Sequence, residues 1–320
     1  MDNISIAIEN GNTIYYPVVE DGVTWETERK GSPGKFTFKI AKDDILKFEE
    51  GNHIVFNYGD NKVFNGFIFT GKHDQDKIIS VTAYDQLRYF KNKDSYMYTN
   101  KKASDVVNMI SEDFRLNVGE IDDTEFIIEK RDEDNQTLFD IVQNALDLSM
   151  TSTNKIFCLY DDYGKLMLKD IENLKVNIII DEETIEGYSY TSTIDSNVYN
   201  RIKLAYDNKD TGTRDIYIAK SSENENNWGI LQYFDKINEV TNGQLKADTL
   251  LKMYNKKCRN LTIKNALGDV RVRAGTSVLV RMKLYDIELC NYMLVEKAKH
   301  TFNHGQHLMD LTLRGHGISV

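Results

Sequence analysis

KFTFKIA, residues 35–41, alternates apolar and polar side chains at almost every step. Its apolar residues Phe36, Phe38 and Ile40 lie on one side of an extended chain, and the polar residues lie on the other. This period of two is typical of a β-strand that has one buried face. The run IISVTAY, residues 78–84, is also rich in β-branched residues. Both runs therefore predict strands.

Short turn signals separate the strands of this first region. Four pairs that are typical of tight turns or bulges lie between residues 25 and 88: Gly51-Asn52, Gly59-Asp60, Asn65-Gly66 and Gly71-Lys72. Such pairs fold consecutive strands into antiparallel hairpins. We therefore expect residues 1–92 to form a compact β domain, either a small barrel or a sandwich.

The apolar period becomes that of a helix beyond residue 92. A first helix is predicted by apolar residues at helical spacing: Ala103, Val106, Val107, Ile110 and Phe114. A second helix is expected after Asn135, because Thr137 and Asp140 have the spacing of a capping box. A hairpin is predicted by two apolar runs and the turn between them: 156–160, 165–169 and Asp161-Asp162-Tyr163-Gly164. Residues 93–186 therefore predict an α/β domain inserted between two β regions.

Alternation returns at residues 202–206 and 214–219, whereas the polar run SSENENN at 221–227 predicts a solvated loop. One helix is predicted after Thr241-Asn242-Gly243-Gln244 by apolar residues at helical spacing: Ala247, Leu250, Leu251, Tyr254 and Cys258. Further strands are expected at 261–263, 278–282, 292–295 and 308–313. Residues 187–320 thus predict a second β domain with one helix. The predicted fold class is α+β, with two antiparallel β domains flanking the inserted α/β domain.

The 320 residues include 40 basic and 50 acidic side chains, a net charge of −10. Such a surface repels phosphate backbones and anionic membranes, so we expect no specific nucleic acid and no membrane as a partner. No apolar run approaches the ~20 residues needed to cross a bilayer, and the N-terminus lacks a secretion signal. The three cysteines, Cys158, Cys258 and Cys290, are too dispersed for a disulfide framework or a zinc knuckle. These features predict a soluble protein made in a reducing cytoplasm.

The densest group of candidate metal ligands is His300, His304 and His307, and imidazole is the commonest ligand of zinc. The surrounding residues alternate like a strand, and Asn303-His304-Gly305 is typical of a turn. The three rings would then point in different directions from a solvated hairpin. We therefore expect no metal site here.

Other candidate motifs lack a required residue. Asp132-Glu133-Asp134-Asn135 has Thr137 where a calcium loop needs glycine, so it predicts a solvated charge run at a helix start. Gly31-Ser32-Pro33-Gly34-Lys35 lacks the frame of a phosphate-binding loop and predicts a turn. The carboxylate pairs do not indicate a glycosidase: Asp43-Asp44, Glu49-Glu50 and Glu182-Glu183.

Three cysteines and two arginines remain as candidates. No motif marks any cysteine as a nucleophile, so we expect all three to be small core residues. Val272-Arg273-Ala274-Gly275 and Arg281 form a modest basic patch, which we expect on the solvent face of a strand. The residues therefore predict no catalytic group, no cofactor and no metal.

Several short segments, in a particular order, carry a family resemblance. They are residues 28–38 (ERKGSPGKFTF), 66–70 (GFIFT), 81–89 (VTAYDQLRY), 137–141 (TLFDI), 199–202 (YNRI), 229–232 (GILQ), 272–275 (VRAG), 300–302 (HTF) and 307–311 (HLMDL). Together they resemble the XkdQ/YqbQ family of PBSX-like prophages, which belongs with the baseplate hub proteins of contractile phage tails. The resemblance covers nearly the whole chain.

The resemblance implies a structural protein with two tail-tube-like β domains. It implies a homotrimeric ring that joins the hexameric tail tube to the trimeric central spike, with a LysM-containing tail protein as a neighbour. The protein would be assembled in the bacterial cytoplasm and reside in the tail baseplate of a phage or of a phage-tail-like bacteriocin. The alternative is a peptidoglycan hydrolase of the tail, in which His300, His304 or His307 would bind a metal. We expect no enzymatic activity.

Overall fold

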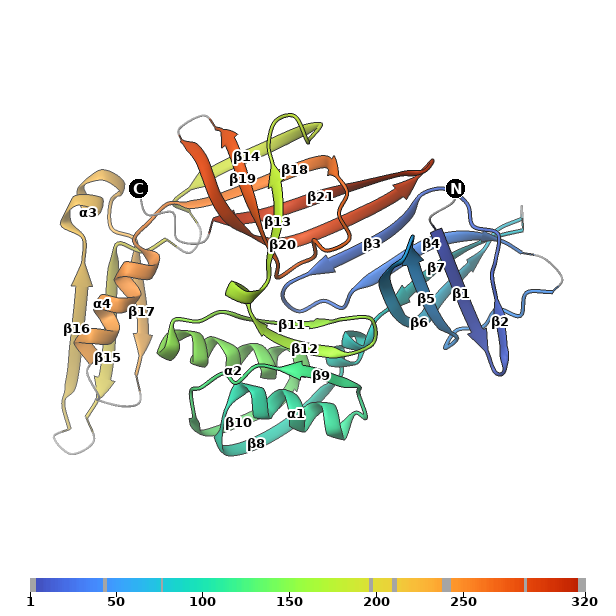
Figure 1. Ribbon diagram of the computed structural model, residues 1–320. Coiled ribbons are helices and arrows are strands. Elements are labelled where there is room, and N and C mark those ends of the chain that lie inside the picture. Colours follow the sequence, from blue (N-terminus) through green and yellow to red (C-terminus); the bar gives the residue numbers. More distant parts are fainter. Residues whose placement is uncertain are drawn as a thin grey trace. The chain divides into compact units, whose positions relative to one another are not determined.

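The computed structural model describes residues 4–42, 45–75, 77–195, 198–208, 212–237, 243–284 and 287–315 (Figure 1). The chain forms two compact units, Met1–Ser189 with Thr262–Val320, and Tyr190–Leu261. Residues 187–320, predicted as one domain, are thus divided between the two units, because a period-two pattern does not reveal which strands pair. The predicted α+β class is confirmed in its coarse form, since the described chain is mostly antiparallel β with helices.

Strands from both ends of the chain build the main sheet of the first unit. The N-terminal strands are β1 (Ile4–Asn10), β2 (Thr13–Tyr15), β3 (Val23–Glu28), β4 (Lys35–Ala41), β5 (His53–Tyr58), β6 (Asn61–His73) and β7 (Ile78–Tyr84). The later strands are β13 (Lys175–Ile180), β14 (Gly187–Thr193), β18 (Cys258–Leu267), β19 (Ser277–Lys283), β20 (Glu288–Asn303) and β21 (Gln306–Gly315). The central order is β21-β20-β3-β4-β7-β6-β5-β1-β2. Strands β14 and β18 carry the chain into and out of the second unit.

Antiparallel pairing of β20 with β3 joins the C-terminal strands to the N-terminal ones, from Lys297 opposite Glu28 to Phe302 opposite Val23. As the alternation predicts, Phe36, Phe38 and Ile40 are buried in the core beneath this sheet. Phe302 of β20 packs in the same core. The core of the N-terminal strands therefore extends to the end of β20.

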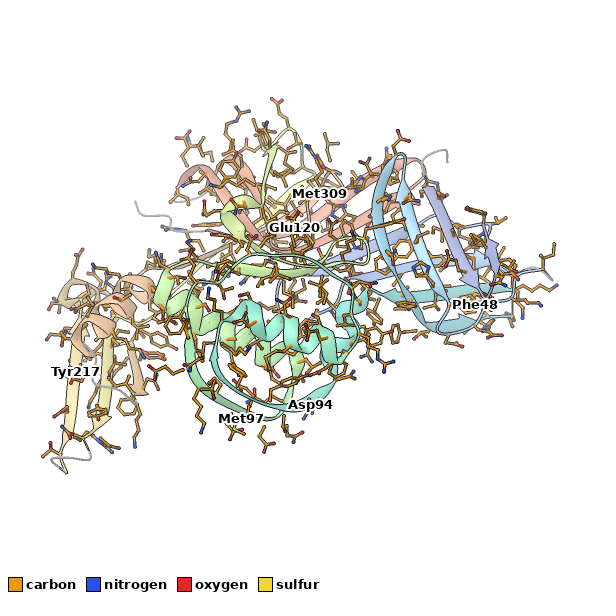
Figure 2. All side chains as sticks on the ribbon, turned by 60° about the horizontal axis from the view of Figure 1, so that its bottom comes forward. Phe48, Asp94, Met97, Glu120, Tyr217 and Met309 are labelled. Atoms are coloured by element: carbon orange, nitrogen blue, oxygen red, sulfur yellow. The ribbon has the colours of Figure 1, made fainter. Side chains whose placement is uncertain are left out.

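The insert of the first unit contains the two predicted helices and the predicted hairpin. Its elements are η1 (Gln86–Lys91), β8 (Lys93–Lys101), α1 (Ala103–Asp113), β9 (Val118–Ile121), β10 (Ile128–Thr137), α2 (Leu138–Thr153), β11 (Phe157–Asp161), β12 (Leu166–Asp170) and η2 (Ile171–Asn173). Thr137 caps α2 by accepting a hydrogen bond from the Asp140 amide, as predicted. The apolar faces of α1 and α2 build a core of their own with Tyr96 and Tyr98 of β8. Met97, between these two tyrosines, points outward from β8 (Figure 2).

The second unit is a small sheet with one helix packed on it. It comprises β15 (Arg201–Asp207), β16 (Arg214–Lys220), α3 (Ser222–Trp228), β17 (Gln232–Lys236) and α4 (Gly243–Tyr254), with sheet order β16-β15-β17. Ala247 and Leu250 of α4 are buried against Ile202 and Leu204, as the helical spacing predicts. Tyr217 of β16, labelled in Figure 2, packs at the edge of this core.

Two predictions for this region are wrong. The run at 221–227, predicted as a loop, is mostly α3, because Ser221 caps it by accepting from the Asn224 amide and acids occupy its first turn. The predicted stripe of α4 also extended too far, since the helix ends at Tyr254 and Cys258 begins β18. Thr241 and Asn242 of the predicted capping box lie outside the described residues.

Candidate functional site

The polar face of the main sheet carries a row of threonines that crosses five strands. Thr301 of β20 lies opposite Thr24 of β3, Thr24 opposite Thr37 of β4, Thr37 opposite Thr82 of β7, and Thr82 opposite Thr70 of β6. The hydroxyls of Thr24 and Thr37 are hydrogen-bonded to each other. Such cross-strand pairs stabilise a sheet without needing a covering layer. This face is therefore suited to contact with water or with a polar partner.

A second row on the same face alternates in charge. Asp310 lies opposite Lys299, Lys299 opposite Glu26, and Glu26 opposite Lys35. Opposite charges on neighbouring strands attract, and within this row Lys35 pairs with Glu26 at 4.0 Å. A groove of about 390 Å³ lies over these residues. We take this face and its groove as the candidate functional site, because their polar side chains are half-buried or exposed although they lie at the centre of the sheet.

The three candidate histidines do not come together. His300 is fully buried, and its Nε2 lies 2.7 Å from the carbonyl oxygen of Val272. Its Nδ1 lies 2.9 Å from Nε2 of His307. His304 instead occupies the exposed turn and contacts Asp21 at 2.9 Å. The prediction of a solvated hairpin is wrong for His300, because strand alternation turns it inward onto Trp25.

The hydrogen bonds fix the tautomers of the histidine pair. A carbonyl oxygen only accepts, so His300 Nε2 carries the proton and His300 Nδ1 accepts from His307 Nε2. Burial lowers the pKa of His300 to about 3 and that of His307 to about 4. Both ring nitrogens of His300 are engaged in hydrogen bonds within the protein, so this ring has no lone pair left for a metal. Across the described ranges, no group of three or more His, Cys, Asp or Glu side chains could hold a metal ion.

A second buried polar cluster lies where η1, the β11–β12 turn and the loop after residue 271 meet. Asp85 Oδ2 accepts from the Gly34 amide at 2.8 Å, and Asp161 Oδ2 accepts from Gln86 Nε2 at 2.9 Å. Arg273 stacks on the ring of Tyr160, with Cζ 3.0 Å from the ring centroid. We call Asp85, Asp161 and Arg273 the carboxylate junction. A cavity of about 20 Å³ beside it has room for one water molecule.

The carboxylate junction has shifted pKa values. Burial, followed by the charge of Asp161, holds the pKa of Asp85 well above its ordinary value. Burial also raises the pKa of Asp161 to about 6 and lowers that of Arg273. The sequence analysis placed Arg273 on the solvent face of a strand, which is wrong because residues 271–275 form turns before β19 begins. A pattern of alternating residues does not distinguish such a buried loop from a strand.

The other candidate residues have structural partners or lie at the surface. Glu133, predicted in a solvated run, is buried because Arg131 Nε donates to it at 2.9 Å and Asn144 donates at 3.2 Å. Arg281 is exposed and pairs with Asp181 at 2.9 Å. Glu49-Glu50 and Glu182-Glu183 lie apart at the surface. Residues 31–34 lie in the β3–β4 connection, and Lys35 begins β4. Asp43-Asp44 lies outside the described residues.

The cysteines differ from one another in burial. Cys158 is buried, as predicted, and burial raises the pKa of its thiol. Cys258 is half-buried, and Cys290 is exposed on β20. The prediction that all three are core residues is therefore wrong for Cys290, which occupies an outward position of its strand. Within the described part of the chain, no helix is long and apolar enough to span a membrane.

Two curated relatives from Bacillus subtilis (strain 168) match almost the whole chain. The uncharacterised protein YqbQ is 25% identical over 312 residues, which is 93% of each chain. The phage-like element PBSX protein XkdQ is 26% identical over 310 residues, which is 94% of each chain. The matches thus span the insert as well as the main sheet.

Solved structures share the fold at lower sequence identity. The 43 kDa tail protein of prophage MuSo2 from Shewanella oneidensis superposes with a TM-score of 0.69 at 14% identity, covering 97% of this chain and 98% of that one. A chain of the Francisella PdpA-VgrG complex superposes with a TM-score of 0.56 at 12% identity, covering 99% of this chain and 58% of that one. The YqbQ-like family model matches residues 23–314. The chain therefore belongs to the YqbQ-like family, a group with prophage-related members.

Proposed function

We propose that this protein is the structural hub of a contractile tail baseplate, in a phage or in a phage-tail-like bacteriocin. The observation that carries the proposal is the β3–β20 pairing, which joins two sets of antiparallel strands edge to edge within one chain. The fold shared with tail proteins supports a role in the tail. We propose that each set of strands is one tube-like β domain, separated in sequence by the α/β insert.

Symmetry supports a trimer as the working form. A sixfold tube cannot meet a threefold spike through equivalent contacts. A trimer whose chains each carry two similar domains offers pseudo-sixfold symmetry to the tube and true threefold symmetry to the spike. The proposed partners are therefore two further copies of this chain, the tail tube protein, the central spike protein and a LysM-containing tail protein. Assembly would take place in the bacterial cytoplasm.

The test is a mass measurement by light scattering, first on the protein alone and then with the tube and spike proteins encoded beside it. We expect a threefold ring, visible by electron microscopy, in the presence of the spike protein. A monomer in isolation is compatible with the proposal, because assembly proteins often oligomerise only on their partner. A stable dimer, or no binding to either partner at micromolar concentrations, would overturn it.

We also propose that the role is structural rather than enzymatic. The hydrolase alternative would place a metal on His300, His304 or His307, but the first and last of these bond to each other and the middle one points elsewhere. A purified chain should therefore leave peptidoglycan intact, with or without added zinc. Cell-wall digestion that His304→Ala or a chelator abolishes would establish the alternative.

A further inference from the structure

Five lysines line the groove of about 390 Å³ on the polar face of the main sheet. They are Lys35, Lys91, Lys264, Lys297 and Lys299, and we call this feature the lysine groove. The acidic residues that line it are Glu26, Glu28 and Asp310. Positive charge thus outweighs negative charge here, on a chain whose net charge is −10. The groove is therefore a local exception to the electrostatics of the whole molecule.

Each acidic residue of the groove already has a basic partner. The Lys297–Glu28 pair is 2.8 Å apart, the Lys264–Asp310 pair 3.1 Å, and the Lys35–Glu26 pair 4.0 Å. The other two lysines, Lys91 and Lys299, are exposed and form no ion pair with any described residue. The unbalanced charge of the groove therefore resides on these two side chains.

The hydrogen-bonding groups of the groove are also mostly donors. Besides the lysines, five hydroxyl-bearing residues line it, and each of their hydroxyls can donate: Thr27, Ser32, Tyr84, Thr262 and Thr312. The three carboxylates, which would accept from a ligand, already face lysine ammonium groups. A ligand that complements this lining must bring acceptors and negative charge.

The placement of the lysines favours an extended ligand. Lys35 lies on β4, Lys264 on β18, Lys297 and Lys299 on β20, and Lys91 at the end of η1. They do not converge on one point, as they would around a single phosphate ion. Carboxylates lie between them, which disfavours the closely spaced phosphates of a nucleic acid. A nucleic acid carries a phosphate at every nucleotide, whereas a protein segment can carry carboxylates opposite the lysines and neutral side chains opposite Glu26, Glu28 and Asp310.

We propose that the lysine groove binds an extended acidic segment of another protein. Lys91 and Lys299 are the residues that attract its carboxylates, and the three internal ion pairs hold the remaining lysines in place. The proposal goes beyond the hub function and does not depend on the trimer. It assigns a role to a face of the sheet that the fold alone leaves open to water.

The test measures the binding of a fluorescein-labelled peptide of ten glutamates by fluorescence anisotropy. In the full-length protein, Lys91→Glu/Lys299→Glu should weaken binding by at least about tenfold at low salt. Lys91→Gln/Lys299→Gln should weaken peptide binding less. In the unsubstituted protein, 300 mM salt should also weaken peptide binding, because the pairs between peptide carboxylates and groove lysines are exposed. Thermal unfolding of each variant checks that the fold is retained.

The matched control is Lys101→Glu/Lys130→Glu, which changes the net charge equally at exposed positions of β8 and β10. This control should reduce peptide binding by less than about twofold under the same conditions, since Lys101 and Lys130 do not line the groove. Equal losses in both variants would show nonspecific attraction and overturn the proposal. Tighter binding of a ten-nucleotide thymidine strand, lost in the Lys91/Lys299 variant, would also overturn it and identify a nucleic-acid site instead.

Discussion

The histidine pair and the carboxylate junction are both buried polar clusters of the first unit, but they compensate for lost solvation in different ways. His300 and His307 stay neutral, and the Val272 carbonyl oxygen fixes which nitrogen of His300 carries the proton and so which one accepts from His307. Asp85 and Asp161 bond to backbone and amide donors, with the Arg273 guanidinium close to Asp161. The histidine pair stays neutral, whereas the carboxylate junction contains carboxyl groups that can become charged. Acid should therefore change the free energy of unfolding in opposite directions at the two clusters.

The two clusters also differ in how they relate to the strands. The histidine pair belongs to paired strands β20 and β21 and stacks on aromatic rings, with Trp25 at 5.0 Å and Phe302 at 4.2 Å from the facing ring centroids. The carboxylate junction is built from turns that three separate segments contribute. Packing therefore dominates the first cluster, whereas hydrogen bonds to the backbone dominate the second.

The largest expected effect is that of His300→Ala. The change removes a fully buried ring, leaves a cavity and leaves the Val272 carbonyl oxygen without its donor. We expect the free energy of unfolding to fall by about 3–5 kcal/mol. Urea unfolding followed by the fluorescence of Trp25, in a Trp228→Phe background, measures it. The control His304→Ala removes an exposed contact with Asp21 and should cost less than about 0.5 kcal/mol. Equal costs would show that packing does not dominate the histidine pair.

A glycine substitution tests the carboxylate junction. A Cβ at Gly34 would lie 2.3 Å from Asp85 Oδ2, so Gly34→Ala must displace the carboxylate that its own amide binds. We expect a loss of about 1–3 kcal/mol in the same unfolding assay. Gly187→Ala is the control, because nothing lies within 4 Å of its Cβ position. A neutral Gly34→Ala would mean that the junction tolerates repacking.

The acid response of the histidine pair is tested by His307→Gln, whose amide can still donate to His300. The folded pKa of His307, about 4, is below the ordinary 6.5, so the unfolded state takes up the proton first. Stability from this group is complete above pH 6.5 and is lost as pH falls toward 4. Between pH 7 and pH 5, the variant should lose about 1–2 kcal/mol less than the unsubstituted protein. An identical loss of stability in the two proteins would contradict the conclusion that the histidine pair is neutral.

The carboxylate junction should show the smallest effect, with the opposite sign. The folded pKa of Asp161, about 6, is above its ordinary value, so the folded state takes up the proton first and gains stability as pH falls through 6. Asparagine cannot titrate, so the cost of Asp161→Asn should be about 1–2 kcal/mol larger at pH 5 than at pH 8. Urea unfolding at the two pH values measures this. A cost that is larger at pH 8 would reverse the assigned sign.

Local features of the fold could be predicted from the sequence. The start of α2 follows from Thr137 and Asp140, which lie within one helical turn and bond to each other directly. The turn at Tyr163-Gly164 follows from a glycine that takes a φ of +85°. In each case the interacting residues are adjacent in the chain, so the sequence pattern contains the whole interaction.

Features that join distant segments could not be predicted in the same way. The β3–β20 pairing, the inward position of His300 and the burial of Arg273 each depend on residues more than a hundred positions away. The candidate site shares this property, because the lysine groove combines seven elements that are separate in the chain: β3, β4, β7, η1, β18, β20 and β21. Its two unpaired lysines carry no local signal, since exposed lysines are common on any surface.

The pairing of β3 with β20 also bears on how the protein is made. The residues that close this junction are separated by about 270 positions, so at roughly 5–20 residues per second the ribosome needs roughly 15–50 s to supply the partner of β3. During this interval the helical insert, whose contacts are local, can fold behind the emerging chain. Strand β3 meanwhile presents an open edge to every neighbouring nascent chain. A nascent chain whose β3 edge pairs with a neighbour during this interval cannot form its own β3–β20 pairing.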